Sequence, residues 1–215
     1  MAEVRKFSYP HPENELLDDL ERYRDYALAL GATEAKIVGA QDILFDPRVR
    51  LKCLYPKCHW YGTNAHCPPH VPEVEEMRRM LSPYRYGIFY CIRVPTEGFA
   101  GTIDGSQKPA EYAERQLANY KIASLVEARA FYEGYVLAVG FAGGPCKPIF
   151  CSDKDCSAII QGQGCRAVLR ARTSLEGAGI YALAMAAKAE WDVYPRGRNA
   201  ESLTYHTALG MVLID

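Results

Sequence analysis

Seven of the eight cysteines in this 215-residue chain lie in two short segments, a grouping that is typical of metal ligands. The second segment supplies four thiols, at Cys146, Cys151, Cys156 and Cys165. The first supplies three, at Cys53, Cys58 and Cys67. The last three cysteines of both segments are separated by four and then eight residues. The repeated spacing predicts two sites of similar kind, one with a fourth thiol and one without.

The spacing of these cysteines favours iron–sulfur clusters over zinc. Structural zinc sites usually take their ligands from close pairs such as C-x-x-C, and neither segment contains that pair. Thiolates placed singly along a loop suit a [4Fe-4S] cluster, in which each thiolate binds one iron. We therefore predict [4Fe-4S]-type clusters, with Zn²⁺ as the alternative.

The fourth ligand of the three-cysteine segment is open to several interpretations. Cys91 would complete the set if its apolar segment runs beside the loop, although it also suits a buried core residue. An imidazole can replace a thiolate, and His59, His66 and His70 are within reach along the chain. Alternatively no protein group fills the position, and an iron with a free site binds a substrate.

Composition and charge exclude several classes of function. The net charge of -1 and the isoelectric point near 6.5 argue against a dedicated binder of nucleic acids or membrane surfaces. We find neither a secretory signal nor an apolar run long enough to span a bilayer, so we expect a cytoplasmic protein. In a reducing compartment, thiols bind metals more often than they form disulfides. The length suits one metal-binding domain, residues 1–215.

The elements that must position the cysteines follow from hydrophobic periodicity and from turn residues. Apolar residues at steps of four and three predict a helix over 13–30, which Gly31 ends. Thr173-Ser-Leu-Glu176 reads as a capping box that starts a further helix. The other predicted elements are strands at 35–40, 87–94, 135–142 and 208–214, helices at 74–81 and 110–133, and a loop at 95–109. We predict an α/β or α+β fold, with a central mixed sheet flanked by helices and two cysteine-rich metal-binding loops.

Several motifs together resemble one known family. They are Cys53-x4-Cys58, Tyr61-Gly62, Cys67-Pro68-Pro69, Gly143-Gly-Pro-Cys146, Ser174-Leu-Glu-x-x-Gly-Ile180 and a C-terminal Gly-x-Val-Leu-Ile strand. In this combination the chain resembles a divergent member of the "predicted metal-binding protein" family, domain of unknown function 2284. The resemblance implies metal binding, most plausibly iron–sulfur, in a cytoplasmic protein of anaerobes, and it brings no established reaction.

These observations predict an iron–sulfur protein that acts in electron transfer or in the reduction or desulfuration of a small substrate. We expect a redox partner protein or a small-molecule substrate, with no nucleic acid and no membrane. The oligomeric state stays open, with a homodimer as one option. Arg166, Arg170 and Arg172 lie near Cys165 and either offset cluster charge, receive an acidic redox partner or are ordinary solvated side chains. From a different class, the alternative is a non-catalytic zinc protein that serves structure or partner binding.

Overall fold

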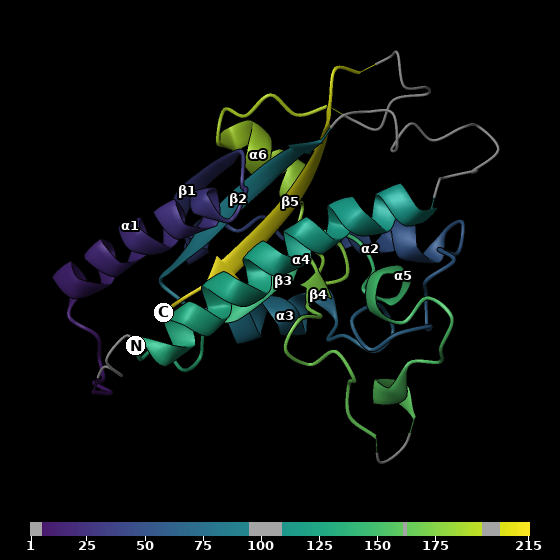
Figure 1. The fold of residues 1–215 in the computed structure, drawn as a ribbon, viewed down its shortest axis with the longest axis horizontal. Coiled ribbons are helices and arrows are strands. Elements are labelled where there is room, and N and C mark those ends of the chain that lie inside the picture. The colour runs from purple at the N-terminus through teal and green to yellow at the C-terminus, as the bar shows by residue number, and fades with distance from the viewer. Residues whose placement is uncertain (1–5, 95–108, 161–162, 195–202) are drawn as a thin grey trace.

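A mixed five-stranded sheet forms the centre of the fold (Figure 1). The computed structural model describes residues 6–94, 109–160, 163–194 and 203–215, and of 109–115 only the backbone. Its strand order is β1-β2-β5-β3-β4. All neighbouring pairs are antiparallel except β3 and β4, which are parallel. This arrangement confirms the predicted fold and resolves its class as α+β. The elements are α1 (Glu13–Ala29), β1 (Glu34–Gly39), a 3-10 turn η1 (Ala40–Asp42), α2 (Pro47–Leu54), α3 (Val74–Leu81), β2 (Tyr86–Val94), α4 (Pro109–Tyr132), β3 (Val139–Ala142), α5 (Lys147–Phe150), η3 (Ser157–Ile159), β4 (Thr173–Ser174), α6 (Ala182–Lys188) and β5 (His206–Leu213).

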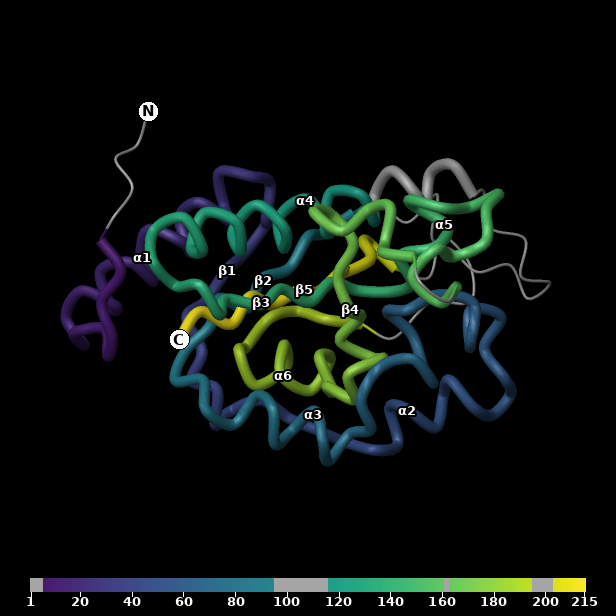
Figure 2. The backbone as a smooth tube through the Cα atoms, turned by 90° about the horizontal axis from the view of Figure 1, so that it is seen from below, coloured from purple at the N-terminus to yellow at the C-terminus, as the bar shows by residue number. Residues whose placement is uncertain are grey.

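Helices cover both faces of the sheet, as Figure 2 shows with α1 and α4 on one side and α3 and α6 on the other. Successive side chains of a strand point to opposite faces. In β2, Ile88 and Tyr90 therefore join the core beneath α1 and α4, and Phe89 and Cys91 join the core beside α3 and α6. Because both faces are buried, β2 is mainly apolar up to Ile92 and β5 is mainly apolar from Ala208 onward, which made them easy to predict.

Two predicted elements are wrong in extent. The helix expected from Thr173 does not start there, because Thr173 and Ser174 form β4 and helix α6 begins only at Ala182. A capping bond forms one residue later than predicted: Ser174 Oγ accepts from Gly177 N at 2.8 Å, whereas Thr173 Oγ1 lies 3.2 Å from His66 Nδ1. The chain then closes a single turn and leaves it at Gly179, whose φ is +77°.

The strand expected over 135–142 is also shorter than predicted. Residues before Val139 close α4 instead, with Tyr135 N bonded to Ala130 O at 3.0 Å and Ala138 N bonded to Tyr135 O at 3.0 Å. The predicted loop at 95–109 lies outside the described residues up to 108, and Pro109 begins α4. None of the helices in the described ranges combines the length and the apolar character needed to cross a bilayer.

Candidate metal centre

The first cysteine segment begins inside a helix that the sequence analysis missed. Asp46 caps α2 by accepting a hydrogen bond from Arg48 N at 2.8 Å, with Pro47 in the first turn. Asp46-Pro47, a capping residue followed by a proline suited to the first helical position, is the signal that could have revealed this helix. Cys53 lies in its last turn, and Cys58 N then bonds to Cys53 O at 3.0 Å. The chain leaves α2 through a tight turn that joins the first two thiols.

The second cysteine segment is a run of turns that follows β3. Cys146 precedes the short helix α5, and Cys151 N closes that helix on Lys147 O at 2.8 Å. Ser157, next to Cys156, donates from Oγ to Gly164 O at 2.7 Å and so closes the loop that leads to Cys165. Internal hydrogen bonds therefore shape a loop that carries one thiol per turn.

Asn64 joins the two segments. Its side chain is 1% exposed, and its Oδ1 accepts from His66 N at 3.1 Å and from Cys146 Sγ at 3.5 Å. A hydrogen bond with the same amide lowers the pKa of Cys67. One buried amide thus contacts one cysteine of each segment, which places the two predicted sites side by side.

The pKa values of several thiols depend on the charges of neighbouring cysteines. The pKa of Cys67 is raised to about 11. Burial is the main cause, the neighbouring Cys53 and Cys58 add to it, and the hydrogen bond with Asn64 acts against it. The pKa of Cys146 is raised strongly by burial and then by four other thiols, those of Cys67, Cys156, Cys165 and Cys151. The pKa of Cys53 is also raised, first by burial and then by Cys58. Cys67 and Cys146 therefore link the seven predicted ligands into one electrostatically coupled region.

A cavity of about 780 Å³ opens beside the three-cysteine segment, and Cys53, Cys58 and Cys67 line it. Its walls are mainly apolar, and they come from α2, the β3–α5 turn, the segment between β4 and α6, and β5. Apolar and aromatic wall residues include Val49, Trp60, Pro145, Ile180, Tyr181, Leu183, Tyr194 and Leu209. The volume lies in the range of small-molecule sites.

The four side chains considered as a fourth ligand lie elsewhere. Cys91 packs in the core beside α3 and α6, where burial raises its pKa to about 11. The Nδ1 atom of His66 lies 3.2 Å from Thr173 Oγ1, and burial lowers its pKa. His59 is exposed against the Trp60 ring, and His70 is exposed. None of these four is among the described residues that line the cavity.

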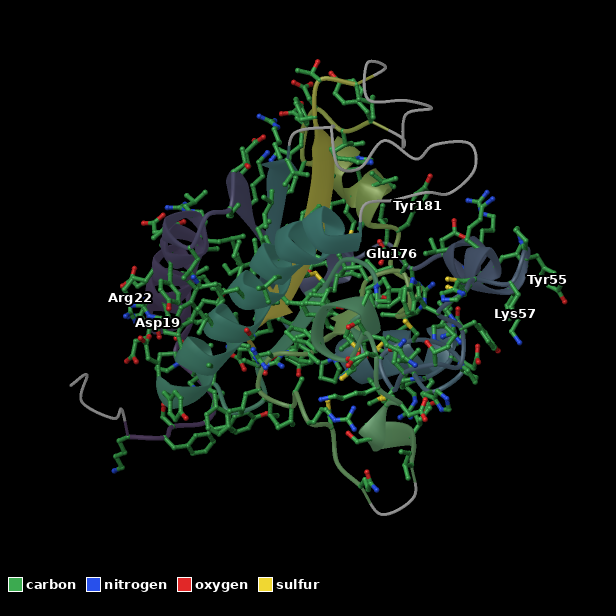
Figure 3. The ribbon with its side chains drawn as sticks, turned by 45° about the vertical axis from the view of Figure 1, so that its right-hand side comes forward. Asp19, Arg22, Tyr55, Lys57, Glu176 and Tyr181 are labelled. Atoms are coloured by element: carbon green, nitrogen blue, oxygen red, sulfur yellow. The ribbon has the colours of Figure 1, made fainter. Side chains whose placement is uncertain are left out.

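Glu176 does line the cavity, and the sequence analysis assigned it only to a capping box. Parallel strands end at the same edge of a sheet. Glu176, two residues beyond β4, therefore lies near Gly144, two residues beyond β3, and Gly144 N donates to Glu176 Oε2 at 3.3 Å. Figure 3 shows Glu176 between the sheet and the loop after α2, the loop that carries Tyr55 and Lys57.

The three arginines near Cys165 have structural contacts. Arg172 forms a two-pronged ion pair with Glu127 of α4, at 2.7 and 2.8 Å. Arg166 Nη1 donates to Asp155 O at 2.7 Å, and the Arg170 guanidinium lies 5.2 Å from the centre of the Phe150 ring. These bonds fix the second loop to itself and to α4.

The donor set fits a thiophilic metal or cluster. Thiolates favour zinc, copper(I) and iron–sulfur clusters over hard cations such as Mg²⁺. Seven thiols in two adjacent segments, three of them facing a cavity, are the groups that such a cofactor would bind. As the side chains stand, no three His, Cys, Asp or Glu groups in the described ranges are close enough to hold a single ion.

Fold and site together define an α+β protein with two adjacent thiol-rich loops at one edge of its sheet. The sequence profile of the family described as "Predicted metal-binding protein (DUF2284)" matches residues 36–214, so the chain belongs to that family. The match confirms the resemblance noted from the motifs. Comparison with curated proteins and with solved structures found no match.

Proposed function

We propose that this metal-binding protein carries two [4Fe-4S]-type clusters and acts as a reductive iron–sulfur protein. The four-cysteine loop, Cys146 to Cys165, would hold the cluster that receives electrons from a redox partner protein. The three-cysteine loop, Cys53 to Cys67, would hold the second, at which a small substrate is reduced. When bound, such clusters supply one-electron transfer, and an iron without a thiolate can also bind a substrate.

The observation that carries this proposal is the contact of Asn64 with both Cys67 and Cys146. Two centres held through one amide would be near neighbours, as electron transfer between them requires. A difference between the two loops also supports separate roles. All three thiols of the first loop line the 780 Å³ cavity, whereas none of the four thiols of the second loop is among the residues that line it.

The protein's own groups would select the substrate and control protons. The mainly apolar walls favour a small molecule with substantial apolar surface and exclude much of the water around it. Arg48 and Lys52 line the cavity together with Asp46 and Glu176, and Arg48 is paired with Asp46 at 2.6 Å, so the charged groups of the wall balance one another. Because burial keeps Cys67 protonated in the metal-free protein, loading must release protons to solvent.

Anaerobic reconstitution with iron and sulfide tests the proposal. We expect a brown protein with about eight irons and eight sulfides per chain, as for two cubane clusters. Cys156→Ser should remove one cluster and Cys58→Ser should disturb the other, whereas Cys91→Ser serves as the matched control and should leave both in place. A colourless protein that holds zinc after anaerobic purification would instead support the zinc-binding structural alternative.

A further inference from the structure

We propose that Glu176 is the fourth protein donor at the three-cysteine loop and that it gives way when a substrate binds. The inference rests on the proposed function, because it concerns the metal centre assigned to Cys53, Cys58 and Cys67. It replaces the candidates that the sequence suggested with a residue from a distant part of the chain.

The turn that carries Glu176 is fixed against both elements of the three-cysteine loop. A Cβ atom on Gly177 would lie 3.3 Å from the carbonyl oxygen of His66, the residue before Cys67. Gly177 O also accepts a hydrogen bond at 3.2 Å from Arg50, which lies in the same helix as Cys53. The backbone of Glu176 is therefore held by direct contact with the segments that carry the thiols.

The side chain of Glu176 shares the cavity with the three thiols. It lines the same cavity as Cys53, Cys58 and Cys67, and its charge makes a small contribution that raises the pKa of Cys53 and Cys67. Glu176 is exposed to solvent through the cavity, although loss of hydration among the surrounding residues raises its pKa. Hydrogen bonds from the backbone N–H groups of Glu176 itself and of Gly144 lower its pKa. Among the described residues, no Lys or Arg contributes to the shift in this pKa.

A carboxylate in a thiol-lined cavity is a candidate metal ligand, because Asp and Glu oxygens bind metals beside thiolates and imidazoles. A centre held by three thiolates is anionic overall, but its iron without a thiolate is a Lewis acid that would accept one carboxylate oxygen. Carboxylate oxygen is a harder donor than thiolate and suits such a metal less well, so a substrate can displace it. Glu176 has flexible side-chain torsions and lies in a cavity with free volume, so it can bind the metal and swing away.

Lability of one iron tests this assignment on the full-length protein, reconstituted anaerobically with isotopically enriched iron. Glu176→Gln keeps the shape of the side chain and removes its charge, and Glu76→Gln, exposed on α3, is the matched control. During mild oxidation, Mössbauer and EPR spectra follow conversion of the first cluster from the [4Fe-4S] to the [3Fe-4S] form. The four-cysteine cluster in the same sample reports whether each variant is folded.

We expect Glu176→Gln to bind the labile iron roughly 10- to 100-fold more weakly than wild type, the scale for removing a group that supports a metal ligand. Glu76→Gln and Cys91→Ser should match wild type. Equal lability in Glu176→Gln and wild type, or lability in Cys91→Ser instead, overturns the inference and leaves the proposed function standing. A wild-type protein with no cluster at the first loop overturns both.

Discussion

Asn64→Asp is the sharpest test of a metal centre at the junction of the two cysteine loops. The change replaces one amide nitrogen by oxygen and keeps an acceptor for His66 N, which lies 3.1 Å from Asn64 Oδ1. In the metal-free protein Cys146 carries a proton and can still donate to this position. The position is 1% exposed, and the bonds from Asn64 Nδ2 to Trp60 O and Thr63 Oγ1 are lost, so the metal-free variant should lose roughly 1–3 kcal/mol of stability. Metal affinity is therefore compared only under conditions in which both proteins are folded.

Metal binding changes the balance, because Cys67 and Cys146 then become thiolates. A carboxylate about 4 Å from a thiolate is repelled by roughly 4 kcal/mol at an effective dielectric constant of about 20. The side chain can escape by taking up a proton. From an ordinary carboxyl pKa of about 3.9, that costs ~4 kcal/mol at pH 7 and ~3 kcal/mol at pH 6. Protonation therefore limits the loss to about a thousandfold in affinity at pH 7, and the loss shrinks about tenfold for each pH unit below that.

Competition between the protein and a chelator for Co²⁺ gives the affinity, with the thiolate-to-cobalt charge-transfer band as the readout. Asn14→Asp, exposed on α1, makes the same chemical change far from the thiols and should bind like wild type. The comparison uses the ratio of variant to wild-type affinity, because thiolates bind metal more weakly at lower pH in both proteins. An Asn64→Asp variant that binds Co²⁺ as well as wild type at pH 7, or a ratio that worsens on acidification, would refute this reasoning.

Two further predictions concern the framework of the site. Gly177→Ala should lower the free energy of unfolding by about 1–3 kcal/mol, because its Cβ would lie 2.7 Å from Ser174 Oγ and 3.3 Å from His66 O. Gly164→Ala meets no atom within 4 Å, and chemical denaturation should find it nearly neutral. In the reduced, metal-free protein, Cys67 keeps its proton up to about pH 11 when folded but loses it near pH 9 when unfolded, so stability should fall as pH rises across that window, by up to ~1.4 kcal/mol per unit. Cys67→Ala should make the fall shallower, and an unchanged slope would contradict the assigned burial of this thiol.

Hydrophobic periodicity predicted the elements whose burial is one-sided or complete. Leu16, Leu20, Tyr23 and Ala27 are all fully buried on α1, as their spacing indicated. The helix predicted from Thr173 was wrong because a single capping hydrogen bond has the same sequence signal as the start of a helix. Ser174 forms a capping bond, but Thr173 pairs with Phe141 and Ser174 pairs with Ala142, so both residues belong to a parallel strand.

The candidate site shows the same division between local and distant information. Spacing grouped the seven cysteines, because ligands of one segment are close in sequence. It offered three histidines as a fourth ligand for the same reason, and Cys91 on the condition that its strand runs beside the loop, and it had no means of finding Glu176. That residue reaches the cavity only because β3 and β4 are parallel and end together, a pairing of two residues in each strand.

The edge of the sheet where β3 and β4 end brings Cys146 of the second loop near Glu176 of the cavity. Cys146 lies four residues beyond β3 and Glu176 two residues beyond β4, so the pairing of Phe141 with Thr173 and of Ala142 with Ser174 helps to set their separation. Arg172, next to β4, is tied to Glu127 of α4, which also accepts from Gly140 N of β3 at 2.6 Å. A single carboxylate thus holds both strands in register. Because such a short pairing has few bonds of its own, the geometry of the proposed metal centre depends on this ion pair.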